Sequence, residues 1–118
     1  MHELSIARAL IEAAATAARD AGAQRVTRLR CRVGALRMVD PRLLGEAFAA
    51  AREGTACASA ELDVTPVGLR GRCRACDHDF SISGWDWRCP ICGGEGEGLT
   101  AGDELELVSI DAETSDEG

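Results

Sequence analysis

The segment RCRACDHDFSISGWDWRCPICGG, residues 72–94, contains two Cys-x-x-Cys pairs, Cys73/Cys76 and Cys89/Cys92. Two thiolates separated by two residues can face one ion from a single tight turn, and two such turns complete a tetrahedron. This arrangement is typical of a closed structural zinc site, with rubredoxin-like iron as the main alternative because it uses the same ligands. A closed set of four thiolates leaves no open position for a substrate, so we expect a structural centre rather than a catalytic one.

The residues between the two cysteine turns are expected to build a small core over the metal. Residues 80–87 predict a hairpin with Gly84 at its bend, because glycine readily adopts turn conformations. His78 is expected at the surface, Cys31 in the core as a small apolar residue, and Cys57 in a loop without a metal partner. The side chains expected to pack over the metal are Phe80, Ile82, Trp85 and Trp87.

Hydrophobic periodicity predicts two helices outside this segment, over residues 4–21 and 42–53. Gly22 and Gly54 follow the two helices as C-terminal caps do, and Pro41 stands at the first turn of the second helix. The apolar face of the first helix is predicted to comprise Leu4, Ala7, Ile11, Ala14, Ala15 and Ala18. That of the second is predicted to comprise Leu43, Leu44, Ala47, Phe48 and Ala51.

Three segments show the two-residue period of strands, over residues 25–34, 60–67 and 104–110. The first alternates apolar residues with arginines, which indicates one buried face and one solvated face. The order of elements predicts an α+β fold: a small three-stranded sheet covered by two helices, with a zinc-ribbon-like four-cysteine module inserted before the last strand. The expected domains are residues 1–67 with 100–112, the zinc-binding residues 68–99, and a disordered acidic tail at 113–118.

The charge of the chain is unevenly placed. The 118 residues include 13 arginines and no lysine, and the formal net charge is −7. Residues 103–118 carry seven acids and no base, which accounts for the whole net charge. Phosphate binding needs clustered positive charge, so we expect no nucleic-acid partner. The start of the chain lacks the features of a secretory signal, and no apolar run approaches the roughly 18–20 residues of a membrane span. We therefore expect no membrane partner and a cytoplasmic location, where thiols stay reduced.

The amino terminus offers a second set of metal donors in Met1-His2-Glu3. The α-amine of Met1 and the backbone and ring nitrogens of His2 can close two fused chelate rings on one ion. The backbone or carboxylate of Glu3 can supply a fourth donor. Nitrogen-rich planar sites of this kind suit Ni(II) or Cu(II). Amines and imidazoles lose protons near neutral pH, so binding should weaken as pH falls, and an exposed site built mostly from backbone suits a carrier.

Several motifs occur in an order that is similar to a known family. They are MHELSIA at 1–7, VGAL at 33–36 before VDP at 39–41, Gly54-Thr55, the two cysteine turns, and ELELVSI at 104–110. Together they resemble the HypA/HybF family, the accessory proteins that insert nickel during maturation of [NiFe]-hydrogenase. The chain departs from that family at Glu46-Ala47-Phe48-Ala49, where a Phe-Ala-Phe-Glu-like stretch is usual; this difference concerns the packing of the second helix and a partner contact implied by the resemblance, and not the metal ligands.

The resemblance implies a nickel metallochaperone rather than an enzyme. It implies transient Ni(II) bound by His2 with Met1 and Glu3, and structural Zn(II) bound by Cys73, Cys76, Cys89 and Cys92. It also implies two partners, a HypB-type GTPase and the hydrogenase large-subunit precursor, with urease served as well in some relatives. A homodimer stands as an alternative to a monomer. The alternative function is a zinc-ribbon protein-interaction module without metal transfer, in which His2 is incidental.

Overall fold

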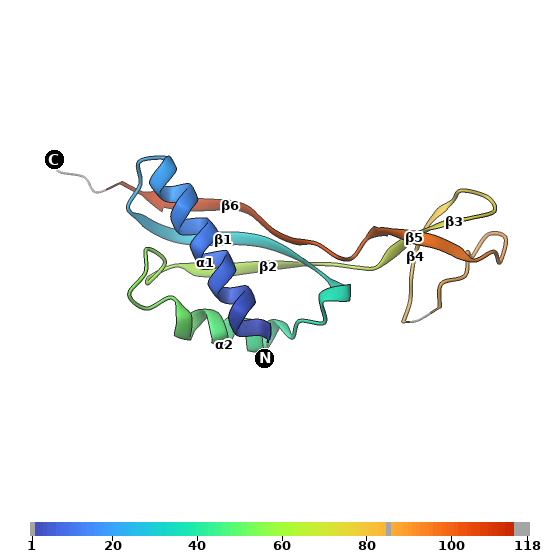
Figure 1. The fold of residues 1–118 in the computed structure, drawn as a ribbon, viewed down its shortest axis with the longest axis horizontal. Helices are drawn as coiled ribbons and strands as arrows, with labels where there is room; N and C mark the ends of the chain where they lie inside the picture. The colour runs from blue at the N-terminus through green and yellow to red at the C-terminus, as the bar shows by residue number, and fades with distance from the viewer. Residues whose placement is uncertain (1, 85, 115–118) are drawn as a thin grey trace. The chain divides into compact units, whose positions relative to one another are not determined.

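The computed structural model describes residues 2–84 and 86–114, and its ribbon is shown in Figure 1. The chain forms two compact units, one from residues 2–32, 39–65 and 106–114 and the other from Val33–Met38 and Pro66–Leu105. The elements in chain order are α1 (His2–Asp20), β1 (Arg25–Gly34), η1 (Ala35–Arg37), α2 (Pro41–Ala51), β2 (Glu61–Val67), β3 (Arg70–Cys73), β4 (Asp79–Ser81), β5 (Gly96–Ala101) and β6 (Leu105–Glu113). The α+β class, both predicted helices and all three predicted strands are confirmed.

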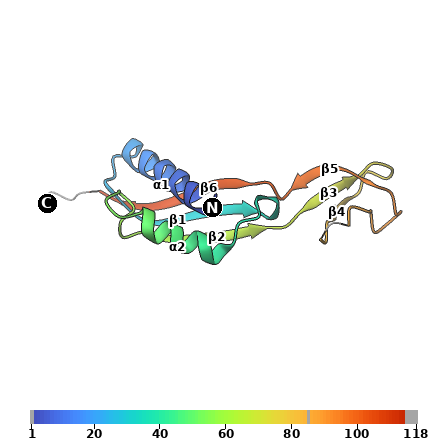
Figure 2. The same cartoon turned by 60° about the horizontal axis from the view of Figure 1, so that its bottom comes forward.

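The first sheet has the strand order β2-β1-β6, so the alternating strand β1 lies at its centre. Helices α1 and α2 lie together on one face of this sheet, as Figures 1 and 2 show from two directions. Leu29, Cys31 and Val33 are the buried residues of the predicted alternation, and burying a side chain such as leucine contributes about 1.5–3 kcal/mol. The apolar side chains of β1 therefore form the buried face of the first sheet.

The predicted apolar face of α1 is only partly correct. Leu4 is 40% exposed, whereas Ile6 and Leu10 are buried although the prediction omitted them. This helix contains so many alanines that apolar residues occur on more than one of its faces. The face that is buried is the one that carries the larger side chains of Ile6, Leu10 and Ile11. In α2, Leu44 and Phe48 are buried as predicted, while Leu43 is 40% exposed.

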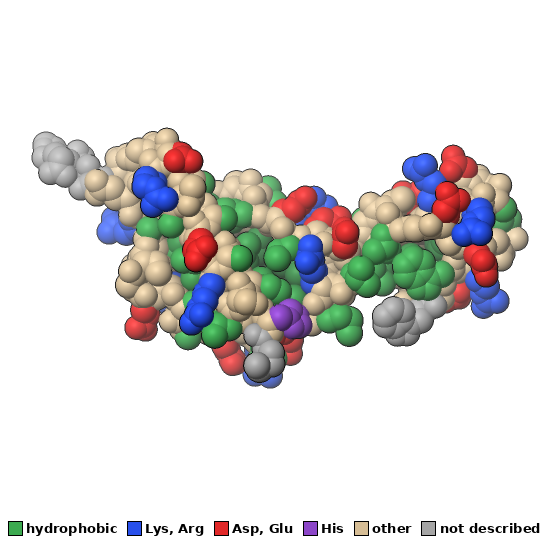
Figure 3. All heavy atoms as spheres, in the orientation of Figure 1, with side chains coloured by type: hydrophobic (Ala, Val, Ile, Leu, Met, Phe, Trp, Pro, Cys, Tyr) green, Lys and Arg blue, Asp and Glu red, His purple; other side chains and the backbone are tan. Residues whose placement is uncertain are grey.

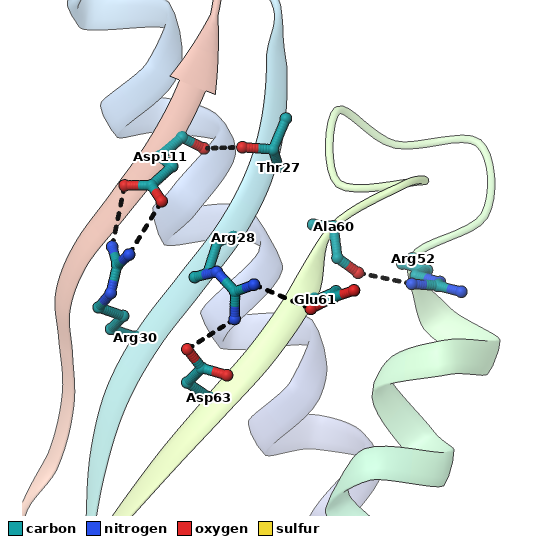
Figure 4. Close-up of polar contacts among 8 residues, drawn as sticks. All are labelled: Thr27, Arg28, Arg30, Arg52, Ala60, Glu61, Asp63 and Asp111. Atoms are coloured by element: carbon teal, nitrogen blue, oxygen red, sulfur yellow. Dashed lines mark hydrogen bonds and ion pairs between the residues drawn. The ribbon is translucent and has the colours of Figure 1, made fainter.

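The opposite face of the first sheet is solvated and carries ion pairs, which Figure 4 shows in close-up. Arg28 on β1 contacts Glu61 and Asp63 on β2, while Arg30 makes two hydrogen bonds of 2.9 Å to Asp111 on β6. The Arg30 guanidinium lowers the pKa of Asp111. Exposed pairs of this kind contribute little stability, but acids on the two edge strands disfavour pairing with another sheet.

The second unit contains a smaller sheet with the order β4-β3-β5. β3 pairs antiparallel with β4, with Arg70 opposite Ser81, and antiparallel with β5 through a register irregularity. The buried residues are Cys73, Phe80, Ile82 and Cys89, with Leu69, Trp87 and Leu99 packed against them. Three of the four side chains expected over the metal thus lie in this core, and Trp85 lies outside the described residues.

Parts of this unit differ from the sequence prediction. Gly84 does form a tight turn at φ 60°, with a bridge between Ser83 and Asp86, but the residues before it pair with β3 rather than completing the predicted hairpin. In the first unit, strand β6 runs through Glu113, the first residue of the predicted tail, while residues 115–118 lie outside the described chain.

Charged side chains of both signs are interspersed over the face drawn in Figure 3. Within residues 2–84 and 86–114, no helix is long and apolar enough to cross a lipid bilayer.

Candidate metal centres

The four cysteines of the two Cys-x-x-Cys pairs converge in the second unit. Their sulfur atoms all lie within 4.8 Å of one another, with 3.4 Å between the Sγ atoms of Cys73 and Cys92 and 3.7 Å between those of Cys76 and Cys89. A tetrahedral zinc with Zn–S bonds of about 2.3 Å requires sulfurs roughly 3.8 Å apart. A disulfide would require about 2.05 Å, so the cluster has the dimensions of a metal site and not of a disulfide pair.

The two cysteine turns repeat the same backbone hydrogen bonds. In the first turn, Cys73 N–H donates to His78 O at 2.8 Å and Asp77 N–H donates to Cys73 O at 3.0 Å. In the second, Cys89 N–H donates to Gly94 O at 2.8 Å and Gly93 N–H donates to Cys89 O at 2.9 Å. The two turns therefore hold their cysteines with the same backbone hydrogen-bond pattern.

The fourth residue after the first cysteine of each turn has a positive φ. It is 64° at Asp77 and 74° at Gly93. Aspartate is one of the few residues other than glycine that tolerate this conformation.

Backbone N–H groups in these turns point at sulfur. Cys76 N–H donates to Cys73 Sγ and Ile91 N–H donates to Cys89 Sγ, both at 3.4 Å. The Cys76 N–H lowers the pKa of Cys73 to about 6, which favours its thiolate. The His78 N–H also lowers the pKa of Cys76, but partial loss of hydration and the neighbouring thiols raise it to about 12. Four thiolates at this spacing repel one another, so a divalent cation is needed to ionise the complete set.

Gly94 keeps the space beside the sulfurs uncrowded. A Cβ placed on Gly94 would lie 3.2 Å from Cys73 Sγ and 3.3 Å from Cys92 Sγ, so a larger residue would require these sulfurs to shift by a few tenths of an ångström. Cys73 and Cys89 are buried, whereas Cys76 and Cys92 are exposed. In the described part of the chain these cysteines are the one group of three or more His, Cys, Asp or Glu side chains whose ligand atoms converge.

The other predicted donors lie at the start of α1, in the first unit. His2 is exposed, and Ser5 Oγ donates to its carbonyl oxygen at 2.9 Å. Met1 lies outside the described residues. The structure thus gives no convergent set of described donors here and leaves the predicted ligands untested.

Glu3 has a structural role that the sequence did not indicate. It is 8% exposed, and its Oε2 accepts a hydrogen bond of 3.2 Å from the backbone N–H of Asp40. Asp40 is the N-cap of α2, where its Oδ1 accepts from Arg42 N–H at 2.9 Å and Leu43 N–H at 3.5 Å. One carboxylate therefore ties the first turn of α1 to the first turn of α2. No local sequence pattern reveals this contact, because the two residues lie 37 positions apart in sequence.

The Glu3 contact predicts a pH dependence of stability. The Asp40 N–H is the main cause that lowers the pKa of Glu3 from 4.5 to about 2. A lowered carboxyl pKa gives stability that is fully present above pH 4.5 and is lost as pH falls toward 2. We expect Glu3→Gln to lower the melting temperature by a few degrees at pH 7, with a difference from wild type that shrinks below pH 4.5.

Helix ellipticity at a series of pH values measures this effect, because α1 and α2 both belong to the first unit. Glu12→Gln is the matched control, since Glu12 is an exposed acid on the same helix and should change stability by no more than about 0.5 kcal/mol. A constant difference between Glu3→Gln and wild type from pH 7 to pH 3 would contradict the assignment.

These features define an α+β metal-binding protein with one four-thiolate centre and an exposed histidine at the start of its first helix. A family described as "Hydrogenase/urease nickel incorporation, metallochaperone, hypA" matches residues 1–112. The chain belongs to the HypA family. It is 34% identical over 113 residues to hydrogenase maturation factor HypA of Desulfitobacterium hafniense, covering 96% of this chain and 99% of that protein.

Two further comparisons agree with the family assignment. The HypA of Deinococcus radiodurans is 43% identical over 108 residues, which cover 91% of this chain and 89% of that protein. The solution structure of the Ni metallochaperone HypA from Helicobacter pylori matches with a TM-score of 0.72 at 27% identity, covering 98% of this chain and all of that one. The resemblance stated from the sequence motifs is therefore confirmed.

Proposed function

We propose that this protein carries Ni(II) for the maturation of [NiFe]-hydrogenase, and that it acts as a metallochaperone and not as an enzyme. Membership of the HypA family over almost the whole chain is the observation that carries this proposal. The sequence supports the same conclusion from chemistry, because Met1 and His2 supply an amine, an amide and an imidazole that can chelate one ion. Urease is a second possible recipient, in line with the family's description.

Nickel would bind at Met1, His2 and Glu3. The carboxylate of Glu3 already accepts the Asp40 N–H, so we propose that Glu3 contributes its backbone nitrogen. The N-terminal end of α1 carries a partial positive charge, which disfavours a bound cation. Loss of an amide proton on nickel binding leaves a negative charge on nitrogen, which offsets this repulsion. Nickel affinity should therefore fall steeply as pH decreases.

Zinc would bind at Cys73, Cys76, Cys89 and Cys92 as a resident structural ion. The sulfur spacing and the amides aimed at sulfur support this assignment. Zinc with four thiolates has no vacant position, so the two metals would have separate tasks in the two units.

Nickel titration of a His2→Ala variant tests the proposal. Loss of a residue that only hydrogen-bonds a metal ligand typically weakens metal binding by ~10–100-fold. His2→Ala removes a proposed ligand itself, so we expect nickel affinity to fall by more than this. Zinc content and helix content should stay unchanged. His78→Ala is the matched control, since His78 is the other histidine of the chain and is exposed. A residue added before Met1 should also weaken binding because it displaces the α-amine. Unchanged affinity in His2→Ala would favour a zinc-ribbon interaction module instead.

The partners that follow from this function are a HypB-type GTPase and the hydrogenase large-subunit precursor, with a homodimer as a further association state. These partners and the reduced thiols are consistent with a cytoplasmic location, which we propose for the protein.

A further inference from the structure

The four cysteines of the metal centre in the second unit differ in their access to solvent. Cys73 and Cys89 are 1% and 3% exposed, whereas Cys76 and Cys92 are exposed. The susceptibility of a cysteine to oxidation follows its thiolate character and its exposure. Zinc binds all four cysteines as thiolates, so a small oxidant dissolved in water meets Cys76 and Cys92 first and meets them in their nucleophilic form.

Each exposed cysteine contacts a buried cysteine of the other turn. The Sγ atoms of Cys92 and Cys73 lie 3.4 Å apart and those of Cys76 and Cys89 lie 3.7 Å apart, and both contacts have hydrogen-bond geometry, so the paired sulfurs face each other. A disulfide bond of about 2.05 Å requires the two pairs to approach by roughly 1.4 and 1.7 Å. Each exposed cysteine therefore has a second cysteine beside it that can complete a disulfide.

We propose that the four-cysteine centre is a modification site for hydrogen peroxide or a related hydroperoxide, which converts it into the disulfides Cys73–Cys92 and Cys76–Cys89 and releases its zinc. This inference rests on the zinc assignment made under the proposed function. It concerns residues of the second unit alone and is independent of the nickel donors at the start of α1.

The reaction at each pair has two steps. The exposed thiolate first attacks one peroxide oxygen, so that the O–O bond breaks, an S–O bond forms and hydroxide leaves; the product is a sulfenic acid. The buried thiolate then attacks the sulfenic sulfur, so that the S–O bond breaks, the S–S bond forms and a second hydroxide leaves. The two sulfurs lose two electrons and one peroxide gains them. Two peroxides thus oxidise all four thiolates, and zinc leaves without changing its own charge because no ligand remains.

The two disulfides would join the same two turns that zinc joins. In sequence, the Cys76–Cys89 link lies inside the loop closed by Cys73–Cys92, and this loop contains β4 and the core residues Phe80 and Ile82. Covalent links of this kind restrict the unfolded chain, so they stabilise the folded one. The oxidised unit should therefore keep the sheet β4-β3-β5 after it has lost its zinc.

The test is a titration of the zinc-loaded wild-type protein with two equivalents of hydrogen peroxide. We expect one zinc per chain to be released, as measured with a zinc-sensitive dye, and the number of thiols to fall from six to two. Peptide mapping should show Cys73–Cys92 and Cys76–Cys89, with the buried Cys31 and Cys57 still reduced. Hydrogen exchange should show retained protection in β3, β4 and β5. Dithiothreitol followed by zinc should restore the starting state.

Cys31→Ala is the matched control, because it removes a buried thiol that lies outside the sulfur cluster. Its zinc release and its disulfides should equal those of wild type. Zinc retention, disulfides within each turn, sulfinic acids in place of disulfides, or links between two chains would each overturn the proposal. Loss of protection in the small sheet after oxidation would do the same. A reduced protein isolated without zinc would refute the zinc assignment as well, whereas the nickel function fails separately, if His2→Ala retains nickel.

Discussion

Replacing Cys73 by serine should abolish zinc binding and unfold the second unit while α1, α2 and the first sheet remain folded. Cys73 is 1% exposed and lies in the core with Phe80, Ile82 and Cys89, so its sulfur is both a proposed ligand and a packing atom. Structural zinc sites bind with roughly 10–16 kcal/mol near neutral pH, which is as large as the roughly 5–15 kcal/mol that stabilises a whole domain. The small sheet β4-β3-β5 has few other buried residues that could replace this energy.

Metal analysis and hydrogen exchange measure this result. We expect zinc content to fall from one ion per chain to almost none, with loss of amide protection in β3, β4 and β5. Cys31→Ala is the matched control, because Cys31 is equally buried but lies on β1 outside the sulfur cluster. That variant should keep its zinc and lose at most a few kcal/mol of stability in the first unit. Full zinc occupancy in Cys73→Ser would contradict the assignment of the centre.

The metal centre was largely predictable because its ligands are close in sequence. Two Cys-x-x-Cys pairs restrict the possible geometries so strongly that their convergence needed no knowledge of the fold. What the sequence did not reveal is the equivalence of the two turns. Gly93 indicates a left-handed residue by its type, but Asp77 occupies the matching position without such a signal.

The strands of the first sheet were predictable for a similar local reason. β1 alternates apolar and charged residues over ten positions, and that period is independent of its neighbours. β5, in contrast, reads Gly-Glu-Gly-Leu-Thr-Ala, with two glycines, a single β-branched residue and no aromatic residue, so its composition does not favour a strand. It is a strand because β3 pairs with it, and β3 itself has only four residues.

At the candidate nickel site, the contact between Glu3 and Asp40 could not be predicted because the two residues are distant in sequence. The motif around His2 indicated donors, but it could not show that the Glu3 carboxylate is engaged with Asp40. The same holds for the turn formed by residues 34–38, called the 34–38 turn, because Gly34 N–H and Leu36 N–H donate to Glu104 O and Gly102 O, more than 60 positions away in sequence. Gly34 was predicted as the last residue of the strand over residues 25–34, yet its surroundings are residues 102–104, which precede β6.

Replacing Gly34 by alanine should destabilise the protein by about 2–4 kcal/mol. A Cβ at this position would lie 2.1 Å from the carbonyl oxygen of Gly102 and 2.6 Å from the nitrogen of Asp103, distances that no real Cβ contact shows. The obstacles are backbone atoms, so no side chain can rotate away. Relief requires the 34–38 turn to move off residues 102–104, which combines an overpacking cost of about 1–3 kcal/mol with the loss of hydrogen bonds worth about 1 kcal/mol each.

Denaturant unfolding of the zinc-loaded protein measures the effect of Gly34→Ala. Gly98→Ala is the matched control in the same unit, because a Cβ there meets nothing within 4 Å and stability should stay within about 0.5 kcal/mol. Gly45→Ala should act in the opposite direction, since Gly45 lies inside α2 with open space around it and alanine favours a helix by about 1 kcal/mol. Opposite signs at Gly34 and Gly45 would show that the backbone contact with Gly102, and not glycine content, determines the stability of the 34–38 turn. A Gly34→Ala variant as stable as wild type would mean that residues 102–104 do not hold the turn in solution.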